Sequence, residues 1–110
     1  MQPKTLKYIL DIERAIFEIE AVLERCQRKF EIFDNDAMAI RSMERLLEII
    51  GEAMGKLLAS DPTINITDSN RIISLRNRLA HAYDSIVNSV LWAIAIRNVP
   101  KLKEELSSLR

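Results

Sequence analysis

The chain has 110 residues, of which 48% are hydrophobic, and its 16 Lys+Arg balance its 16 Asp+Glu. This length supports one domain, residues 1–110, with a single modest core, and it leaves no room for a second domain. Two Gly, three Pro, one Cys and one His favour a mostly helical protein and exclude a disordered chain, an intrachain disulfide and a Cys/His zinc cluster.

Two long helices are expected in the N-terminal half. Apolar residues at three- and four-residue spacing predict an amphipathic helix from about Thr5 to Arg28. Asp34 to Asp36 form an N-cap cluster, after which the same spacing predicts a second helix to about Ala59. Gly51 and Gly55 lie inside it, four residues apart. Because glycine costs roughly 1 kcal/mol in a helix, we expect a close approach of another helix at both.

Three further helices are expected in the C-terminal half. Ser60 to Pro62 break the second helix, and a loop to Asp68 follows. Asp68 or Ser69 caps a third helix that ends near Ala82, and a fourth runs from Ile86 to Arg97. Asn98 to Pro100 then cap and start a short last helix, which ends near Leu109. The predicted fold is all-α, an up-down bundle of four to five helices.

The fourth predicted helix is apolar almost all round, and such a helix has to be covered on several sides. A chain this short offers little to cover it, so we expect a homodimer, with Trp92 as either core or interface filler. The same apolar stretch is far shorter than the ~20 residues that span a bilayer. Charged residues from Lys4 onward exclude a signal peptide. We therefore expect a cytoplasmic protein with no membrane association.

The charges are distributed unevenly along the chain. Between Ser69 and Lys103 the only acid is Asp84, whereas this region contains the bases Arg71, Arg76, Arg78, Arg97, Lys101 and Lys103. An anion-binding surface is therefore expected in the C-terminal half. Ordinary solvated helix faces explain the same pattern equally well.

The segment Arg76-Asn77-Arg78-Leu79-Ala80-His81-Ala82-Tyr83 gathers the side chains most suited to chemistry. On an unbroken helix Asn77 and His81 share a face, so the amide can orient the ring, and Arg76 shares a face with Tyr83. Arg76 and His81, however, diverge by about 140°. Either the helix ends near His81, or the same segment of a second subunit completes the site.

An imidazole exchanges protons near neutral pH, and a guanidinium clamps phosphate oxygens. Together His81 and Arg76 suit transesterification of a phosphodiester, with the histidine as acid or base and the arginine stabilising the pentacoordinate state. On spacing alone, a packed and hydrogen-bonded histidine is the commoner explanation. No metal ligands and no cofactor are expected.

The motif resembles the Arg-x4-His-x-Tyr motif of HepT-like proteins, ribonuclease toxins of the HEPN superfamily. The resemblance continues in Ile50-Gly51-Glu52-Ala53, in Leu91-Trp92 and in Val99-Pro100-Lys101-Leu102, and it follows the right order over nearly the whole chain. It implies a dimeric HEPN-like helical bundle with the motif in a cleft between subunits, which cuts RNA without a metal. It also implies an MntA-like nucleotidyltransferase antitoxin as partner.

The resemblance implies a role for each motif residue. Arg76 and His81 become the catalytic pair, Asn77 and Arg78 give polar support, and Tyr83 becomes the site at which the antitoxin adds AMP. Glu52 matches the family's acidic position, where it either pairs with an arginine across helices or is a solvated surface acid.

Two alternatives to a ribonuclease toxin stay open. One is a catalytically silent subunit that binds nucleotide or acts as a scaffold for its nucleotidyltransferase. The other is a plain dimeric bundle in which His81 is a core residue. Binding a phosphate and cleaving one need the same side chains, so the motif alone does not separate the first alternative from an active enzyme.

Overall fold

The computed structural model describes residues 1–81 and 87–110. In these ranges it is helical and contains no strand, which confirms the all-α prediction. The elements are α1 (Pro3–Arg25), α2 (Phe30–Asp34), α3 (Ala37–Ser60), α4 (Ser69–His81), α5 (Asn88–Ala93), the π-helix η1 (Ile94–Asn98) and α6 (Val99–Ser108).

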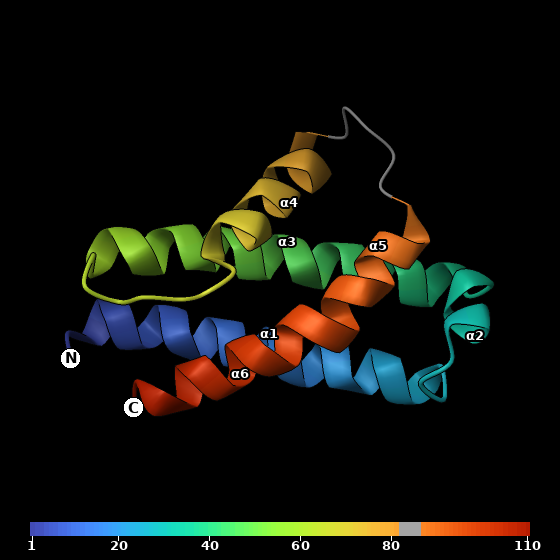
Figure 1. Ribbon diagram of the computed structural model, residues 1–110, viewed down its shortest axis with the longest axis horizontal. Helices are drawn as coiled ribbons and strands as arrows, with labels where there is room; N and C mark the ends of the chain where they lie inside the picture. Colours follow the sequence, from blue (N-terminus) through green and yellow to red (C-terminus); the bar gives the residue numbers. More distant parts are fainter. Residues whose placement is uncertain (82–86) are drawn as a thin grey trace.

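The helices form two layers (Figure 1). The long helices α1 and α3 pack side by side in one layer, and α4 packs on α3. In the other layer α5, η1 and α6 follow one another without a break, and we call this run the C-terminal rod. The rod crosses the long helices and contacts α1, α2 and α3. Among the described residues, no helix is long and apolar enough to cross a membrane.

The first helix ends earlier than predicted, at Arg25 instead of Arg28. Gln27 and Arg28 have φ values of 56° and 55°, in the left-handed region, and this conformation ends the helix. The chain then turns into α2, a short helix that the sequence analysis did not predict. As a result Phe33 is completely buried, with its ring 5.1 Å from that of Trp92. Trp92 is therefore partly buried and packs against the core of its own chain.

The second long helix begins as predicted. Asp36 is its N-cap, and its carboxylate accepts a hydrogen bond from the Ala39 backbone N–H at 3.1 Å. Arg25 also donates to this carboxylate, at 2.8 Å, and together these donors lower the pKa of Asp36. The cap thus joins the end of α1 to the start of α3.

The last helix, α6, begins and ends as predicted, with Asn98 before its first residue and Pro100 in its first turn, but it continues the preceding helix without a break. Asn98 to Pro100 do not interrupt the rod but lie where its turn widens, and the Val99 N–H donates to the Ile94 carbonyl, five residues back. Pro100 has no N–H and its ring crowds the preceding turn, which accounts for the widening. The Asn98 side chain donates to Asp68 Oδ2 at 2.9 Å, and so ties the rod to the start of α4.

Gly51 is the point of closest approach between α3 and α4. A Cβ added there would lie 2.2 Å from Arg76 Cβ and 2.9 Å from the Ile72 carbonyl oxygen. The expected close approach is therefore confirmed at Gly51. It is wrong at Gly55, where an added Cβ would meet nothing within 4 Å.

The two glycines provide a matched test of this contact. Gly51→Ala has to push the backbone of α4 away from α3, and we expect it to lower the free energy of unfolding by about 1–3 kcal/mol. Gly55→Ala fills open space and improves helix propensity, so it should raise that free energy by up to about 1 kcal/mol. Urea unfolding of both variants measures the difference. Equal stability of the two variants would contradict the assigned role of Gly51.

Candidate active site

The motif found in the sequence occupies the C-terminal part of α4. Arg76, Asn77 and Arg78 are described in full. For His81 the structure describes only the backbone, as the last residue of α4. The His81 side chain and the whole of Tyr83 lie outside the described residues, so the predicted contact between Asn77 and the imidazole stays a prediction.

Arg76 is held on the side of α4 that faces α3. Its Nη2 lies 3.8 Å from Glu52 Oε2, and its Nη1 donates to Asn77 Oδ1 at 3.2 Å. The predicted pairing of Glu52 with an arginine across helices is thus confirmed. Glu52 also lies 3.5 Å from Lys56 Nζ. Because all three side chains are partly exposed, such ion pairs add only about 0–1 kcal/mol to stability. Their main effect is to orient the guanidinium.

The contacts of the Arg76 guanidinium leave part of it available for a ligand. Each terminal nitrogen has two N–H groups, and the described contacts use one hydrogen of Nη1 in a hydrogen bond. At 3.8 Å the contact of Nη2 with Glu52 is an ion pair without a hydrogen bond. About 30% of the Arg76 side chain is exposed. Arg76 can therefore donate to a phosphate while Glu52 and Asn77 fix its position.

Arg78 lies on a different side of α4 from Arg76. Side chains two positions apart on an α-helix differ in direction by about 200°. Accordingly, Arg78 lines the groove between α4 and the C-terminal rod. The two arginines of the motif are therefore not brought together at one point. Arg71 of α4 and Arg97 of η1 line the same groove. Both belong to the bases of the C-terminal half, where the sequence predicts an anion-binding surface without saying which of them lie together.

Two other kinds of reactive centre have no support in the described residues. Within residues 1–81 and 87–110, no group of three or more His, Cys, Asp or Glu side chains is placed to hold a metal ion. Cys26 is completely buried, and burial raises the pKa of its thiol, which disfavours the nucleophilic thiolate.

Comparisons with known proteins find relatives that are named as ribonucleases. The family model described as "Ribonuclease HepT-like" matches residues 12–109. A protein of Thermococcus cleftensis named "Probable ribonuclease HepT" is 36% identical over 109 residues, which cover 94% of this chain and 93% of that protein. A protein of Caldanaerobacter subterraneus subsp. tengcongensis, named as an RNase, is 27% identical over 100 residues, 89% of each chain.

A third relative, from Methanocaldococcus jannaschii and also named as an RNase, is 36% identical over 76 residues, 67% of this chain and 69% of that protein. No solved structure matches the chain. The family model spans the chain from the middle of α1 to the end of α6, and the Thermococcus relative is similar over almost its whole length. This chain belongs to the HepT-like ribonuclease family.

Proposed function

We propose that this protein is a metal-independent endoribonuclease in which Arg76 and His81 form the catalytic pair. The observation that carries the proposal is the Arg76 guanidinium, which is held by Glu52 and Asn77 yet keeps N–H groups for a ligand. It lies on the same helix as His81, the only imidazole of the chain. Membership of the HepT-like ribonuclease family makes RNA the substrate.

The proposed step is an internal transesterification of RNA. The 2′-oxygen of a ribose attacks the adjacent phosphorus, the bond from phosphorus to the 5′-oxygen breaks, and the products are a 2′,3′-cyclic phosphate and a 5′-hydroxyl. His81 takes the proton of the 2′-hydroxyl or gives one to the departing 5′-oxygen, and solvent water supplies or takes up the other proton. Arg76 donates to the phosphate oxygens as negative charge builds up on the pentacoordinate state.

The proposed active unit is a homodimer. Helix α4 runs without interruption from Arg76 to His81, and on such a helix these positions point about 140° apart. A second copy, with its own motif facing the first, would bring the arginine of one subunit towards the histidine of the other. An apolar side chain available for such contacts is exposed on the C-terminal rod, namely Ile96, which is 37% exposed.

The proposed biological role is that of the toxin in a toxin-antitoxin pair. A nucleotidyltransferase antitoxin would join AMP to the phenol oxygen of Tyr83, two residues after His81. The added phosphodiester anion could pair with a nearby arginine, and the adenosine would occupy the space that RNA needs. One modification would thus block both the clamp and the access to it.

The catalytic proposal predicts RNA cleavage that persists in EDTA. Arg76→Ala and His81→Ala should each lower the cleavage rate by about 10²–10⁴-fold, because each removes a group that acts in the transition state. Arg76→Lys should rescue little, since an ammonium lacks the planar fork. Arg41→Ala removes an exposed arginine of α3 and should cleave like the wild type.

Gel analysis of a labelled oligoribonucleotide measures these rates, and circular dichroism checks the fold of each variant. Wild-type protein that binds RNA without cutting it would contradict the catalytic proposal. That result would favour the silent, nucleotide-binding subunit instead.

The dimer proposal predicts twice the chain mass of 12.7 kDa in light scattering at micromolar concentration. It also predicts complementation, because an Arg76→Ala chain mixed with a His81→Ala chain can form one intact composite site. Mixing the two inactive variants should therefore restore part of the activity. A monomeric wild type, or a mixture that stays inactive although subunits exchange, would contradict the composite site.

The regulatory proposal predicts that co-expression with the nucleotidyltransferase adds one or more adenylate masses to the intact chain. These increments should disappear in Tyr83→Phe and persist in Tyr8→Phe, which changes the other tyrosine of the chain. Intact-mass spectrometry measures both. Inhibition of an unmodified chain would show that the partner acts by steric binding alone.

A further inference from the structure

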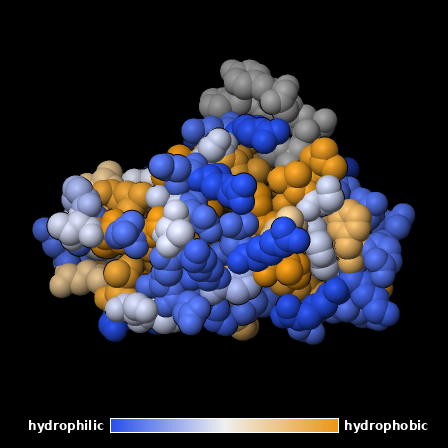
Figure 2. Space-filling view, in the orientation of Figure 1, coloured by the Kyte–Doolittle hydropathy of each residue, from blue (hydrophilic) through white to orange (hydrophobic). Residues whose placement is uncertain are grey.

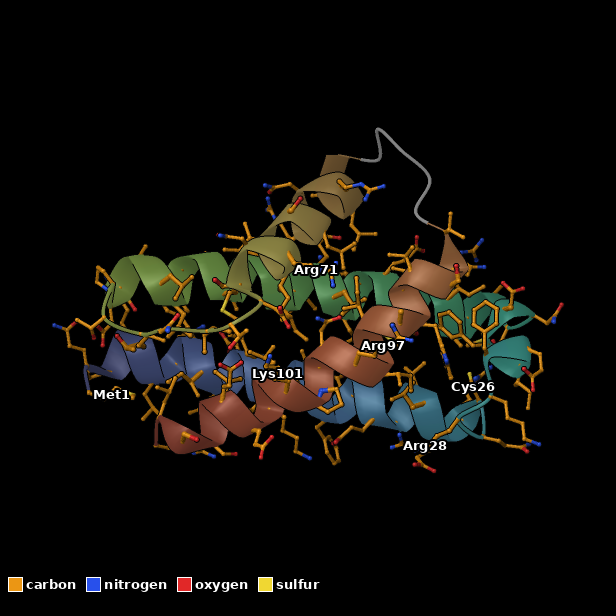
Figure 3. All side chains as sticks on the ribbon, viewed as in Figure 1. Met1, Cys26, Arg28, Arg71, Arg97 and Lys101 are labelled. Atoms are coloured by element: carbon orange, nitrogen blue, oxygen red, sulfur yellow. The ribbon has the colours of Figure 1, made fainter. Side chains whose placement is uncertain are left out.

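A groove of about 570 Å³ lies between α4 and the C-terminal rod. Its polar lining comes from both sides, with Arg71, Ser74 and Arg78 on α4 and with Ser89 and Arg97 on the rod. Figure 3 labels Arg71 and Arg97 on the face of the molecule that α4 and the rod share. Figure 2 shows strongly hydrophilic side chains on that face, with hydrophobic surface between them.

The charge in this groove has one sign. No carboxylate is among the described residues that line it, and Arg71 and Arg97 form no ion pair with any described residue. The acid that precedes Arg71 by three positions, Asp68, accepts a hydrogen bond from Asn98 instead. Arg71 and Arg97 therefore bring positive charge to the groove that no described carboxylate neutralises.

A second groove provides a contrast within the same molecule. It lies between α1 and α3, has a volume of about 390 Å³, and is lined by three bases and three acids, Lys7, Arg14, Lys56, Asp11, Glu18 and Glu52. Two of its bases are paired, Lys7 with Asp11 at 2.8 Å and Lys56 with Glu52 at 3.5 Å. A polyanion is thus attracted to the groove at α4 and not to the one between α1 and α3.

The walls of the groove at α4 are held in place on both sides. Helix α4 rests on α3 through the contact at Gly51, and the Asn98–Asp68 hydrogen bond fixes η1 at the start of α4. Arg97 lies in the widened π-turn, a feature that occurs frequently at functional sites. Since no aromatic side chain is among the described lining residues, contacts to the sugar-phosphate backbone are favoured over stacking of bases.

We propose that this groove is a second phosphate-binding site, in which Arg71 and Arg97 hold the RNA backbone away from the bond that is cut. The inference rests on the proposed ribonuclease function, because it takes single-stranded RNA as the polyanion. On α4 the Arg71 and Arg78 positions point about 140–160° away from Arg76. The groove is therefore separate from the guanidinium that clamps the scissile phosphate, and binding in it is expected to depend strongly on salt and weakly on base sequence.

The test uses the full chain and a fluorescent 2′-O-methyl oligoribonucleotide, which lacks the attacking 2′-hydroxyl and stays intact. Fluorescence anisotropy at several salt concentrations gives the slope of log affinity against log salt. Arg71→Ala/Arg97→Ala should weaken binding about tenfold or more at low salt, and it should reduce the slope by about 1.4, or ~0.7 for each lost phosphate contact. Arg14→Ala/Arg41→Ala removes the same net charge elsewhere and should leave the slope unchanged.

Each outcome either supports or overturns the proposal. Equal effects of the two double variants would overturn it, and so would a change of mass in light scattering for Arg71→Ala/Arg97→Ala, which would make the groove an interface between copies. A cleavage assay on unmodified RNA separates this inference from the proposed function. Wild type that shows the predicted salt slope without cutting RNA supports the groove and contradicts the ribonuclease. Wild type that cuts while the groove variant binds normally contradicts the groove alone.

Discussion

The contact between Gly51 and the stem of Arg76 sets the geometry on which the rest of this structure depends. Because residue 51 has no side chain, α4 lies directly against α3 at the turn from Ile72 to Arg76. The guanidinium is thereby placed next to Glu52, the neighbour of Gly51 in the chain. The same contact turns the opposite flank of α4 towards the C-terminal rod, where the basic groove forms. One missing methyl group thus determines the positions of both arginine-bearing surfaces.

Elements whose signals are local could be predicted from the sequence. The start of α3 was predicted correctly because Asp36 caps the helix with its own side chain, and a cap depends only on residues close by. The end of α1 was predicted three residues too late because Gln27 and Arg28 adopt left-handed φ values without being Gly or Asn. No local preference requires that conformation. The burial of Phe33 against Trp92, a contact between distant segments, accompanies it.

In the C-terminal half, a local rule located the last helix correctly but not its connection to the helix before it. Pro100 was expected to start a new helix, since proline is common at first helical positions. Pro100 does lie in the first turn of α6, but α6 continues the rod, whose turn widens just before it. In the candidate site, the pairing of Glu52 with an arginine could be predicted because the family resemblance pointed to Glu52. The grouping of Arg71 with Arg97 could not be predicted, because it depends on where the rod lies relative to α4.

Arg76 links the stability of the folded chain to the chemistry of its guanidinium. Its Nε is buried and has no hydrogen-bond partner among the described residues. A buried donor left without an acceptor costs about 1–3 kcal/mol, which is large against the total stability of a small domain. Lysine has no nitrogen at that point of its side chain, so it would avoid this cost while keeping the positive charge. Where this nitrogen stays unpaired, arginine thus makes the folded state less stable than lysine would. Folding stability alone would favour the lysine, whereas the proposed catalytic role needs the planar donor that only arginine supplies.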